Sequence, residues 1–511
     1  MVTDLKKTEM KKLLILGGGT AGCAAAAALA RQLDPDFYEI TVLDSSYIDG
    51  IGVGESVLPS FISFLRMLGL DEQDFIQKTG ASIKLGIQFR DWLGKEDSFF
   101  HQLGDLGCQL NGSDFFDCWL KARSGGDQTP LQDYAPSAVM ASKQKFDFPC
   151  GFPPGSPLAG ADYALHVDAG LVCKYLRDFA ERRKVRFLKA HVVSVKLGAS
   201  GCIESLELNN RETVAGDFFI DCSGLRSLLI DEALNSGFED WGHFLPCDRA
   251  VTVQTPASAA IPPYSISTAK QGGWTWRIPL QDRISTGYVF SSKYSNDQQA
   301  IRVLLDPVEG KPLQEPHFIP FRSGVHKQLW KKNCIALGLA GGFLEPLEST
   351  AIHLAIRGVE NMLELFPNLG DGLQAWPTLA DEYNRRMRVD YEEIRDFIIL
   401  HYNTSQRTDT EFWRHCQSMP VPDSLTSRLE LFNARAELSV HDGSLFKESS
   451  WLAVLNGMGV QPRNWHPFLD MADFGAIHQD MQAYRASLDA AVQQLQPYQK
   501  FLNSNAASAC G

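Results

Sequence analysis

Residues 11–33, KKLLILGGGTAGCAAAAALARQL, predict a strand, a glycine-rich turn and a helix in immediate succession. The apolar run LLIL is typical of a strand covered on both faces, and the small residues after the turn let a helix lie close to it. A second predicted strand, ITVLD, ends at Asp44, where a carboxylate can accept hydrogen bonds from a ribose. The alternative is a tight turn that binds no ligand. We expect an α/β fold with a parallel sheet and a dinucleotide site formed by Gly17, Gly19, Thr20, Ala21, Gly22 and Asp44.

Three further segments place glycine or polar residues at predicted strand ends. In GIGVGES (50–56) the backbone could approach a ligand closely, although an ordinary loop has the same composition. DFFIDCSGLRS (217–227) predicts a buried strand that ends in a turn. GLAGGFLEPLEST (338–350) leads into a long helix, at whose start unpaired amides and the helix dipole can stabilise an anion. The cofactor-binding candidates in these segments are Gly54, Glu55, Ser56 and Gly338.

The length and charge of the chain restrict the remaining possibilities. At 511 residues it exceeds what one hydrophobic core supports, so two or three packed units are expected. Its net charge of −13 argues against nucleic acid or an anionic membrane as a partner. No apolar run is long enough to span a bilayer, and the charged N-terminal residues differ from a secretory signal. Eleven cysteines without paired spacing predict neither a metal site nor a disulfide framework, so we expect a cytoplasmic protein.

Two segments predict strands with chemically distinct faces. In SIKLGIQF (82–89) apolar and polar residues alternate, which predicts an amphipathic strand with Lys84 on its solvent face. In GGWTWRIP (272–279), Trp274 and Trp276 would point to the same face of a strand, since the side-chain period is two. Two indoles on one face most simply form a hydrophobic wall under a sheet.

Taken together, these motifs resemble those of the flavin-dependent halogenases, specifically the tryptophan (indole) halogenase family. The resemblance extends from Lys12 to about Pro467. Its most specific markers are WxWxIP, here WTWRIP at 274–279, and FxxPxxS, here at 343–349. The other matching motifs are GxGxxG at 17–22, GVGES at 52–56, SIKLGIQF at 82–89, FFH at 99–101 and DCSG at 221–224.

The resemblance implies an activity and an architecture. In this family FAD, supplied as FADH2 by a separate flavin reductase, reacts with oxygen and oxidises chloride or bromide to hypohalous acid. The acid passes through a tunnel to a lysine and halogenates an indole or a tryptophan-like aromatic. We expect a Rossmann-like FAD-binding module over 1–99 and 161–365, and a mainly helical substrate module over 100–160 and 366–511. A homodimer is also compatible with the resemblance.

The resemblance also assigns roles to single residues. Lys84 matches the essential lysine, whose ammonium can hold hypohalous acid. Glu348 matches a carboxylate that can orient the oxidant or take the ring proton. The halide is expected beside the amides of Thr350 and Ala351, at a predicted helix start. Two further groups are a flavin-side barrier of Trp274 and Trp276 and a substrate pocket that contains His101, Phe100 and Trp451.

The sequence departs from the family pattern in two places. Ala351 stands where the family motif has glycine. If that position needed a positive φ, alanine would cost about 1 kcal/mol and halide preference would change. The segment HDGSLFKESSW (441–451) lacks the tyrosine pair with which tryptophan-specific members hold the amino acid. This absence favours a simpler indole or another electron-rich aromatic as substrate.

Two other functions are the alternatives. A flavin-dependent aromatic monooxygenase would hold its substrate against the flavin and would usually accept electrons from NAD(P)H itself. A non-halogenating FAD-binding protein would have no use for Lys84. The tryptophan pair and Lys84 argue against both alternatives.

Overall fold

A six-stranded sheet forms the base of the molecule in this computed structural model, which describes residues 10–45, 54–110, 112–258, 260–308, 311–370 and 376–508. In spatial order its strands are β20 (Trp330–Lys331), β21 (Cys334–Ala336), β12 (Phe218–Asp221), β1 (Lys11–Leu16), β2 (Tyr38–Asp44) and β8 (Arg186–Lys189). All neighbours pair in parallel except β20 and β21. The predicted α/β fold with a parallel sheet is therefore confirmed.

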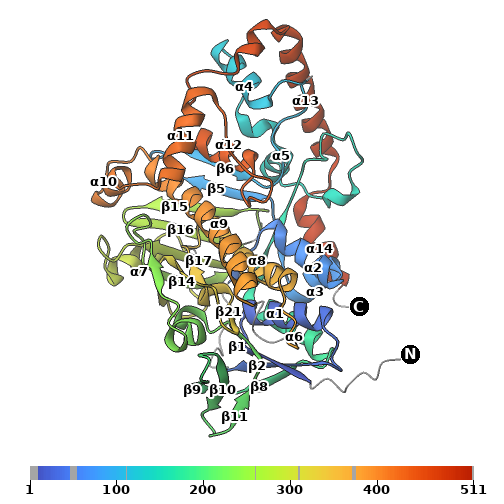
Figure 1. The fold of residues 1–511 in the computed structure, drawn as a ribbon. Coiled ribbons are helices and arrows are strands. Elements are labelled where there is room, and N and C mark those ends of the chain that lie inside the picture. The colour runs from blue at the N-terminus through green and yellow to red at the C-terminus, as the bar shows by residue number, and fades with distance from the viewer. Residues whose placement is uncertain are drawn as a thin grey trace.

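Both faces of β1 are covered, as its apolar run predicted. Leu13 and Ile15 pack in one core with the alanines of α1 (Thr20–Gln32). Leu14 and Leu16 pack in a second core against a small sheet. That small sheet consists of β9 (Val192–Leu197), β10 (Ile203–Leu208) and β11 (Thr213–Ala215). On the side of α1 lie two more helices, α6 (Ala169–Glu181) and α8 (Thr350–Glu364), both in contact with α1 (Figure 1).

A seven-stranded sheet stands above this base in Figure 1. In order it consists of β18 (His317–Pro320), β14 (Arg249–Pro256), β17 (Arg283–Phe290), β16 (Gly273–Pro279), β15 (Ser265–Lys270), β5 (Gly86–Arg90) and β6 (Ser98–Gln102). The structure has two further three-stranded sheets. One consists of β3 (Gly54–Ser56), β7 (Ala164–Asp168) and β4 (Ser82–Lys84), and the other of β13 (Phe238–Asp240), β19 (Gly324–His326) and β22 (Gly342–Phe343).

The prediction for 82–89 was wrong in one respect. The segment forms two strands, β4 and β5, which belong to different sheets, and both of its faces are buried at β4. Lys84 therefore does not face solvent but is 0% exposed. Alternation in the sequence showed that the two faces differ chemically, but it could not show that other elements cover the polar face.

The C-terminal third is helical, and its helices α11, α12 and α13 lie at the top of Figure 1 together with α4 and α5. Its helices are α9 (Trp376–Asn403), α10 (Glu411–Ser418), α11 (Asp423–Arg435), α12 (Glu448–Gly457), α13 (Phe474–Gln494) and α14 (Tyr498–Ser508); the earlier helices are α2 (Pro59–Leu68), α3 (Glu72–Thr79), α4 (Phe115–Ser124), α5 (Pro136–Ser142) and α7 (Asp297–Leu305). The predicted module boundaries stay a prediction. The last helix, α14, contacts α3. At the start of α14, Oη of Tyr498 accepts a hydrogen bond of 2.8 Å from the buried amide of Ile83 in β4. Among the helices of the described residues, none is long and apolar enough to cross a membrane.

Candidate active site

The glycine-rich turn after β1 has a shape that only glycine allows at two of its positions. Gly17 has a φ of 113°, and a Cβ there would lie 2.2 Å from the carbonyl oxygen of Cys222. A Cβ on Gly22 would lie 1.9 Å from the carbonyl oxygen of Gly17. At Gly19, by contrast, a Cβ would meet no atom within 4 Å, and no side chain caps α1. The turn thus leaves an open space at a helix N-terminus, which is suited to a pyrophosphate.

The other predicted residues of the dinucleotide site surround this turn. Thr20 and Ala21 open α1. Asp44 ends β2 beside the turn, with its Cγ 2.6 Å from the place where Gly18 would carry a Cβ. Gly338 has a φ of 59°, and a Cβ there would lie 2.8 Å from that of Ala21. Segments far apart in the sequence therefore meet at the start of α1.

The second glycine-rich element is described only from Gly54 onward, and the predicted Gly50 and Gly52 lie outside the described residues. Gly54 approaches Ser285 of β17 so closely that a Cβ would lie 2.7 Å from that of the serine. Burial, with Asp168 nearby, raises the pKa of Glu55 to about 7. Ser56 has a buried hydroxyl with no partner in the described part of the chain.

Lys84 ends β4 inside the protein. Its Nζ donates to Oγ of Ser349 at 3.2 Å and to the carbonyl oxygen of Val57 at 3.4 Å. Burial lowers the pKa of this ammonium to about 8, although the negative charge of Glu348 acts in the opposite direction. Lys84 can therefore exchange a proton near neutral pH.

Glu348 lies between two histidines. Its Oε1 is 2.9 Å from Nδ1 of His101 and 3.0 Å from Nε2 of His401, and its Oε2 is 2.9 Å from the same Nδ1. None of the three residues is more than 3% exposed. Burial alone would raise the pKa of Glu348, but the positive charge and the hydrogen bonds of its two histidine neighbours, His101 and His401, hold it well below its usual range. The site therefore contains a buried, ionised carboxylate.

A strained turn places Lys84 and Glu348 relative to each other. Glu348 and Ser349 both adopt left-handed backbone conformations, with φ values of 67° and 62°, which is unusual for residues other than glycine. The carboxylate of Glu348 reaches the histidines, while the hydroxyl of Ser349 receives the Lys84 hydrogen bond. Adjacent residues thus hold two different parts of the site.

The start of α8 follows this turn. Ser349 occupies the N-cap position, but its side chain does not cap the helix. Thr350 has a buried hydroxyl without a partner among the described residues. Ala351 lies inside α8 and does not have a positive φ. The condition for strain at this alanine is therefore not met, because the left-handed residues come two and three positions earlier.

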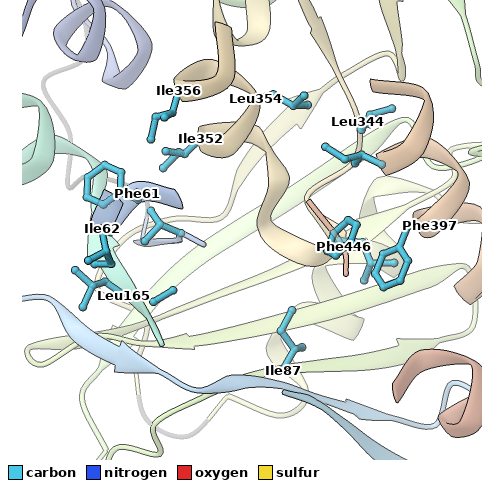
Figure 2. Close-up of a cluster of buried hydrophobic side chains, with 14 of the residues drawn as sticks. Phe61, Ile62, Ile87, Leu165, Leu344, Ile352, Leu354, Ile356, Phe397 and Phe446 are labelled. Atoms are coloured by element: carbon cyan, nitrogen blue, oxygen red, sulfur yellow. The ribbon is translucent and has the colours of Figure 1, made fainter. Parts of the chain in front are cut away.

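Aromatic rings lie beside the His101–Glu348 pair. The rings of Phe397 and Phe446 stack at 3.8 Å, and Figure 2 shows them side by side. Phe397 also contacts His101 at 5.7 Å and Trp451 at 5.0 Å between ring centroids. Phe397 thus joins two predicted pocket residues. Phe100, the third, alternates with His101 on β6 and packs instead on Tyr264 and Gly86.

Apolar packing fixes α8 on its other side. Figure 2 shows Ile352 and Ile356 of α8 facing Phe61 and Ile62 of α2. All four side chains are buried in the main hydrophobic core. Helix α8, which follows Glu348, is therefore packed against α2, which precedes Lys84 in the chain.

The tryptophan pair lies on one face of β16, as predicted, with ring centroids 6.2 Å apart. Trp276 packs on Gly287 of β17, where a Cβ would lie 2.1 Å from the indole. Trp274 is buried and donates from Nε1 to Oε1 of Glu345 at 3.0 Å. The hydroxyl of Tyr402 donates to the same oxygen at 2.6 Å. Trp274 is thus fixed by a buried carboxyl of the FLEPLEST motif.

Sequence reasoning missed several residues of the site: His401, Glu345, Tyr402, Phe397 and Phe446. Glu345 lies inside a motif that had been recognised, so a buried polar residue could have been anticipated there. The others come from α9 and from the segment before α12, where no short motif marks them. Across the described ranges, no group of three or more His, Cys, Asp or Glu side chains is arranged to hold a metal ion.

Glu345→Gln is expected to stabilise the protein at pH 8 and to have little effect at pH 5. Burial raises the pKa of Glu345 from 4.5 to about 7, so its favourable protonated form is fully present below about 4.5 and is lost as the pH rises through 7. Between these pH values the wild type therefore loses about 3 kcal/mol of unfolding free energy, whereas the variant, which has no carboxyl group at this position, does not. The check is the difference in Tm between variant and wild type at the two pH values, and an equal difference at both would contradict the expectation.

Comparison with known proteins identifies the family of this chain. The family model for tryptophan halogenase matches residues 12–474. The tryptophan 6-halogenase SttH of Streptomyces toxytricini is 32% identical over 93% of this chain and 94% of its own length. The solved structure of BrvH, a flavin-dependent halogenase from Brevundimonas sp. BAL3, is 40% identical with a TM-score of 0.92, covering 97% of this chain and 99% of that one. A flavin-dependent halogenase from Xanthomonas campestris is 38% identical with a TM-score of 0.92, covering 97% and 98%.

The family match and the fold are those of a flavin-dependent halogenase enzyme. The chain belongs to the tryptophan halogenase family. Membership implies FAD and a halide, an aromatic substrate and a reductase partner.

Proposed function

We propose that this enzyme halogenates a small indole-like aromatic with chloride or bromide, using oxygen and FADH2 from a separate reductase. The observation that carries the proposal is the buried Lys84, held by Ser349 immediately after the Glu348 carboxylate. Burial disfavours the charged form of this lysine even with its two acceptors, so its presence here points to chemistry.

The residues around α1 fit FAD. The uncapped helix start and the open space at Gly19 would hold the pyrophosphate, and Asp44 would accept from the ribose. When bound and reduced, FAD would supply, with oxygen, the oxidation of halide to hypohalous acid. The halide would lie at the amides of Thr350 and Ala351, where α8 has no side-chain cap and the Thr350 hydroxyl lacks a partner among the described residues.

Lys84 would hold the hypohalous acid through its ammonium and make the halogen more electrophilic. Ser349 and Val57 would orient this ammonium by their hydrogen bonds. Trp274 and Trp276 would form the barrier that keeps the aromatic away from the flavin, with Glu345 fixing the first of them.

The aromatic substrate would bind beside His101, against Phe397, Phe446 and Trp451. Phe446 belongs to the segment in which tryptophan-specific members have a tyrosine pair. A phenylalanine offers an indole ring a contact surface but gives no partner to a charged amino acid. This favours indole over free tryptophan.

The test is product analysis by mass spectrometry, with purified protein, FAD, a flavin reductase, NADH, oxygen and bromide. The probes are indole, tryptophan and 3-methylindole. Monobrominated indole with its bromine isotope doublet is expected. Hydroxylated product without bromine would instead support a monooxygenase, and flavin binding with no product from any probe would support a binding protein.

Phe446→Ala is expected to raise kcat/KM for tryptophan relative to indole by about tenfold, because the space left by the ring can accept the amino-acid group. Loss of this buried ring should also cost about 3 kcal/mol of stability. The matched control is Phe290→Ala, which removes a fully buried ring from a separate core and should lower stability without changing the ratio. If Phe446→Ala left the ratio of kcat/KM for tryptophan to kcat/KM for indole unchanged, the substrate would not bind against Phe446.

A further inference from the structure

The hydrogen bonds around Glu348 determine where protons lie in this site. His401 has an acceptor on each side: its Nδ1 is 2.9 Å from the carbonyl oxygen of Phe397, and its Nε2 is 3.0 Å from Oε1 of Glu348. A carbonyl oxygen carries no proton, so Nδ1 must donate. The contact with Glu348 also needs one proton, held by the imidazole or by the carboxyl group.

Both oxygens of Glu348 face imidazole nitrogens, and these contacts hold its pKa well below the usual range, so the carboxylate keeps its charge. The shared proton therefore belongs to Nε2 of His401, which makes this imidazole a cation. One imidazolium compensates one carboxylate. A second proton on His101 would lie on Nε2, where it would be a buried N–H with no acceptor among the described residues.

His101 is then the neutral partner. Its Nδ1 faces both oxygens of Glu348 at 2.9 Å and must donate to the carboxylate. Its Nε2 consequently carries a lone pair and no proton. This nitrogen is buried and has no partner in the described part of the chain, while the ring lies beside Phe397 and Phe446. A bare nitrogen therefore remains where the aromatic substrate is expected.

We propose that Nε2 of His101 is the base that removes the proton from the halogenated ring, and that Glu348 acts through His101 rather than on the substrate. The assignment rests on the proposed function. It makes His101 and Glu348 a dyad of the kind in which a carboxylate fixes the imidazole tautomer and stabilises the imidazolium that forms. His401 is a positioning residue that keeps Glu348 ionised.

The proposed step balances. Ring electrons form the carbon–halogen bond as the halogen–oxygen bond of hypohalous acid breaks, and the oxygen takes a proton from Lys84 to leave as water. The ring C–H bond then breaks, its electron pair restores the aromatic ring, and the proton passes to Nε2 of His101. Lys84 has lost one proton and His101 has gained one, so a single proton transfer between them resets the site.

The protonation states can be measured without flavin or substrate. In the full-length protein labelled with ring-15N histidine, His101 is expected to show a protonated Nδ1 and a bare Nε2 at pH 7.5, and His401 two protonated nitrogens. His101→Gln and His401→Gln assign the signals. A doubly protonated His101, or one protonated only at Nε2, would overturn the proposal.

Bromination of indole and of ring-deuterated indole in single turnovers tests the step itself. His101→Gln keeps an amide donor for Glu348 but has no basic nitrogen. It should form bromoindole about 100-fold more slowly or worse, with a primary isotope effect that the wild type lacks. His401→Gln should be slower without this isotope effect. A His101→Gln variant with the wild-type rate would overturn the proposal. If the wild type failed on every probe, the proposed function would be contradicted instead, and the NMR result would decide the proton assignment.

Discussion

Lys84→Met is expected to lower bromoindole formation by about 1,000-fold or more while FAD affinity stays unchanged. Methionine has a similar length and fills the same buried space, but it has no charge and no donor, so nothing would hold or polarise the oxidant. Stability should not fall, because burial lowers the pKa of Lys84 to about 8, which means that the charged form is disfavoured in the folded protein. Product is measured by mass spectrometry and FAD binding by fluorescence titration.

The matched control is Lys78→Met. Lys78 lies on α3, 62% exposed in its side chain and paired with Asp74, so its replacement should change neither product nor affinity. A scavenger of free hypobromite is present in all reactions, because oxidant released into solution would brominate indole without Lys84. Product that persists in Lys84→Met despite the scavenger would contradict the assigned role.

Gly22→Ala is expected to disrupt the turn after β1. The added Cβ would lie 1.9 Å from the carbonyl oxygen of Gly17, and this backbone atom cannot rotate away. We expect a loss of about 3 kcal/mol, seen as a lower Tm without FAD. A displaced turn would also weaken FAD binding by about 100-fold.

Gly19→Ala separates ligand contact from folding in the same turn. Its Cβ would enter open space, so the Tm without FAD should not change. If the pyrophosphate lies over this position, the methyl group should weaken FAD binding by about tenfold. Wild-type affinity in Gly19→Ala would show that FAD does not lie over the turn.

The first strand, turn and helix could be predicted because their sequence signals are local. An apolar run, glycines at fixed spacing and small helix residues determine a strand with two covered faces and a tight turn. The structure matches each of these at β1, Gly17, Gly22 and α1. The strand and the long helix predicted on either side of Glu348 are likewise present, as β21 and α8.

The environment of Lys84 could not be predicted in the same way. Its burial depends on elements hundreds of residues away, such as the turn that contains Ser349. His401 was missed because one histidine in a long helix has no motif. The left-handed conformations of Glu348 and Ser349 were also unexpected, since neither residue type signals a positive φ; the family motif pointed to Ala351 as the position where a positive φ would matter.

The contact between Ile83 and Tyr498 has a consequence for how the protein is made. The buried amide beside Lys84 finds its acceptor only in the last helix. Ribosomes synthesise the strand first, and more than 400 residues follow before Tyr498 is added. A buried amide without an acceptor is unfavourable, so the strand cannot reach its final state before Tyr498 has been added. Maturation of the candidate site around Lys84 is therefore delayed until Tyr498 has left the ribosome.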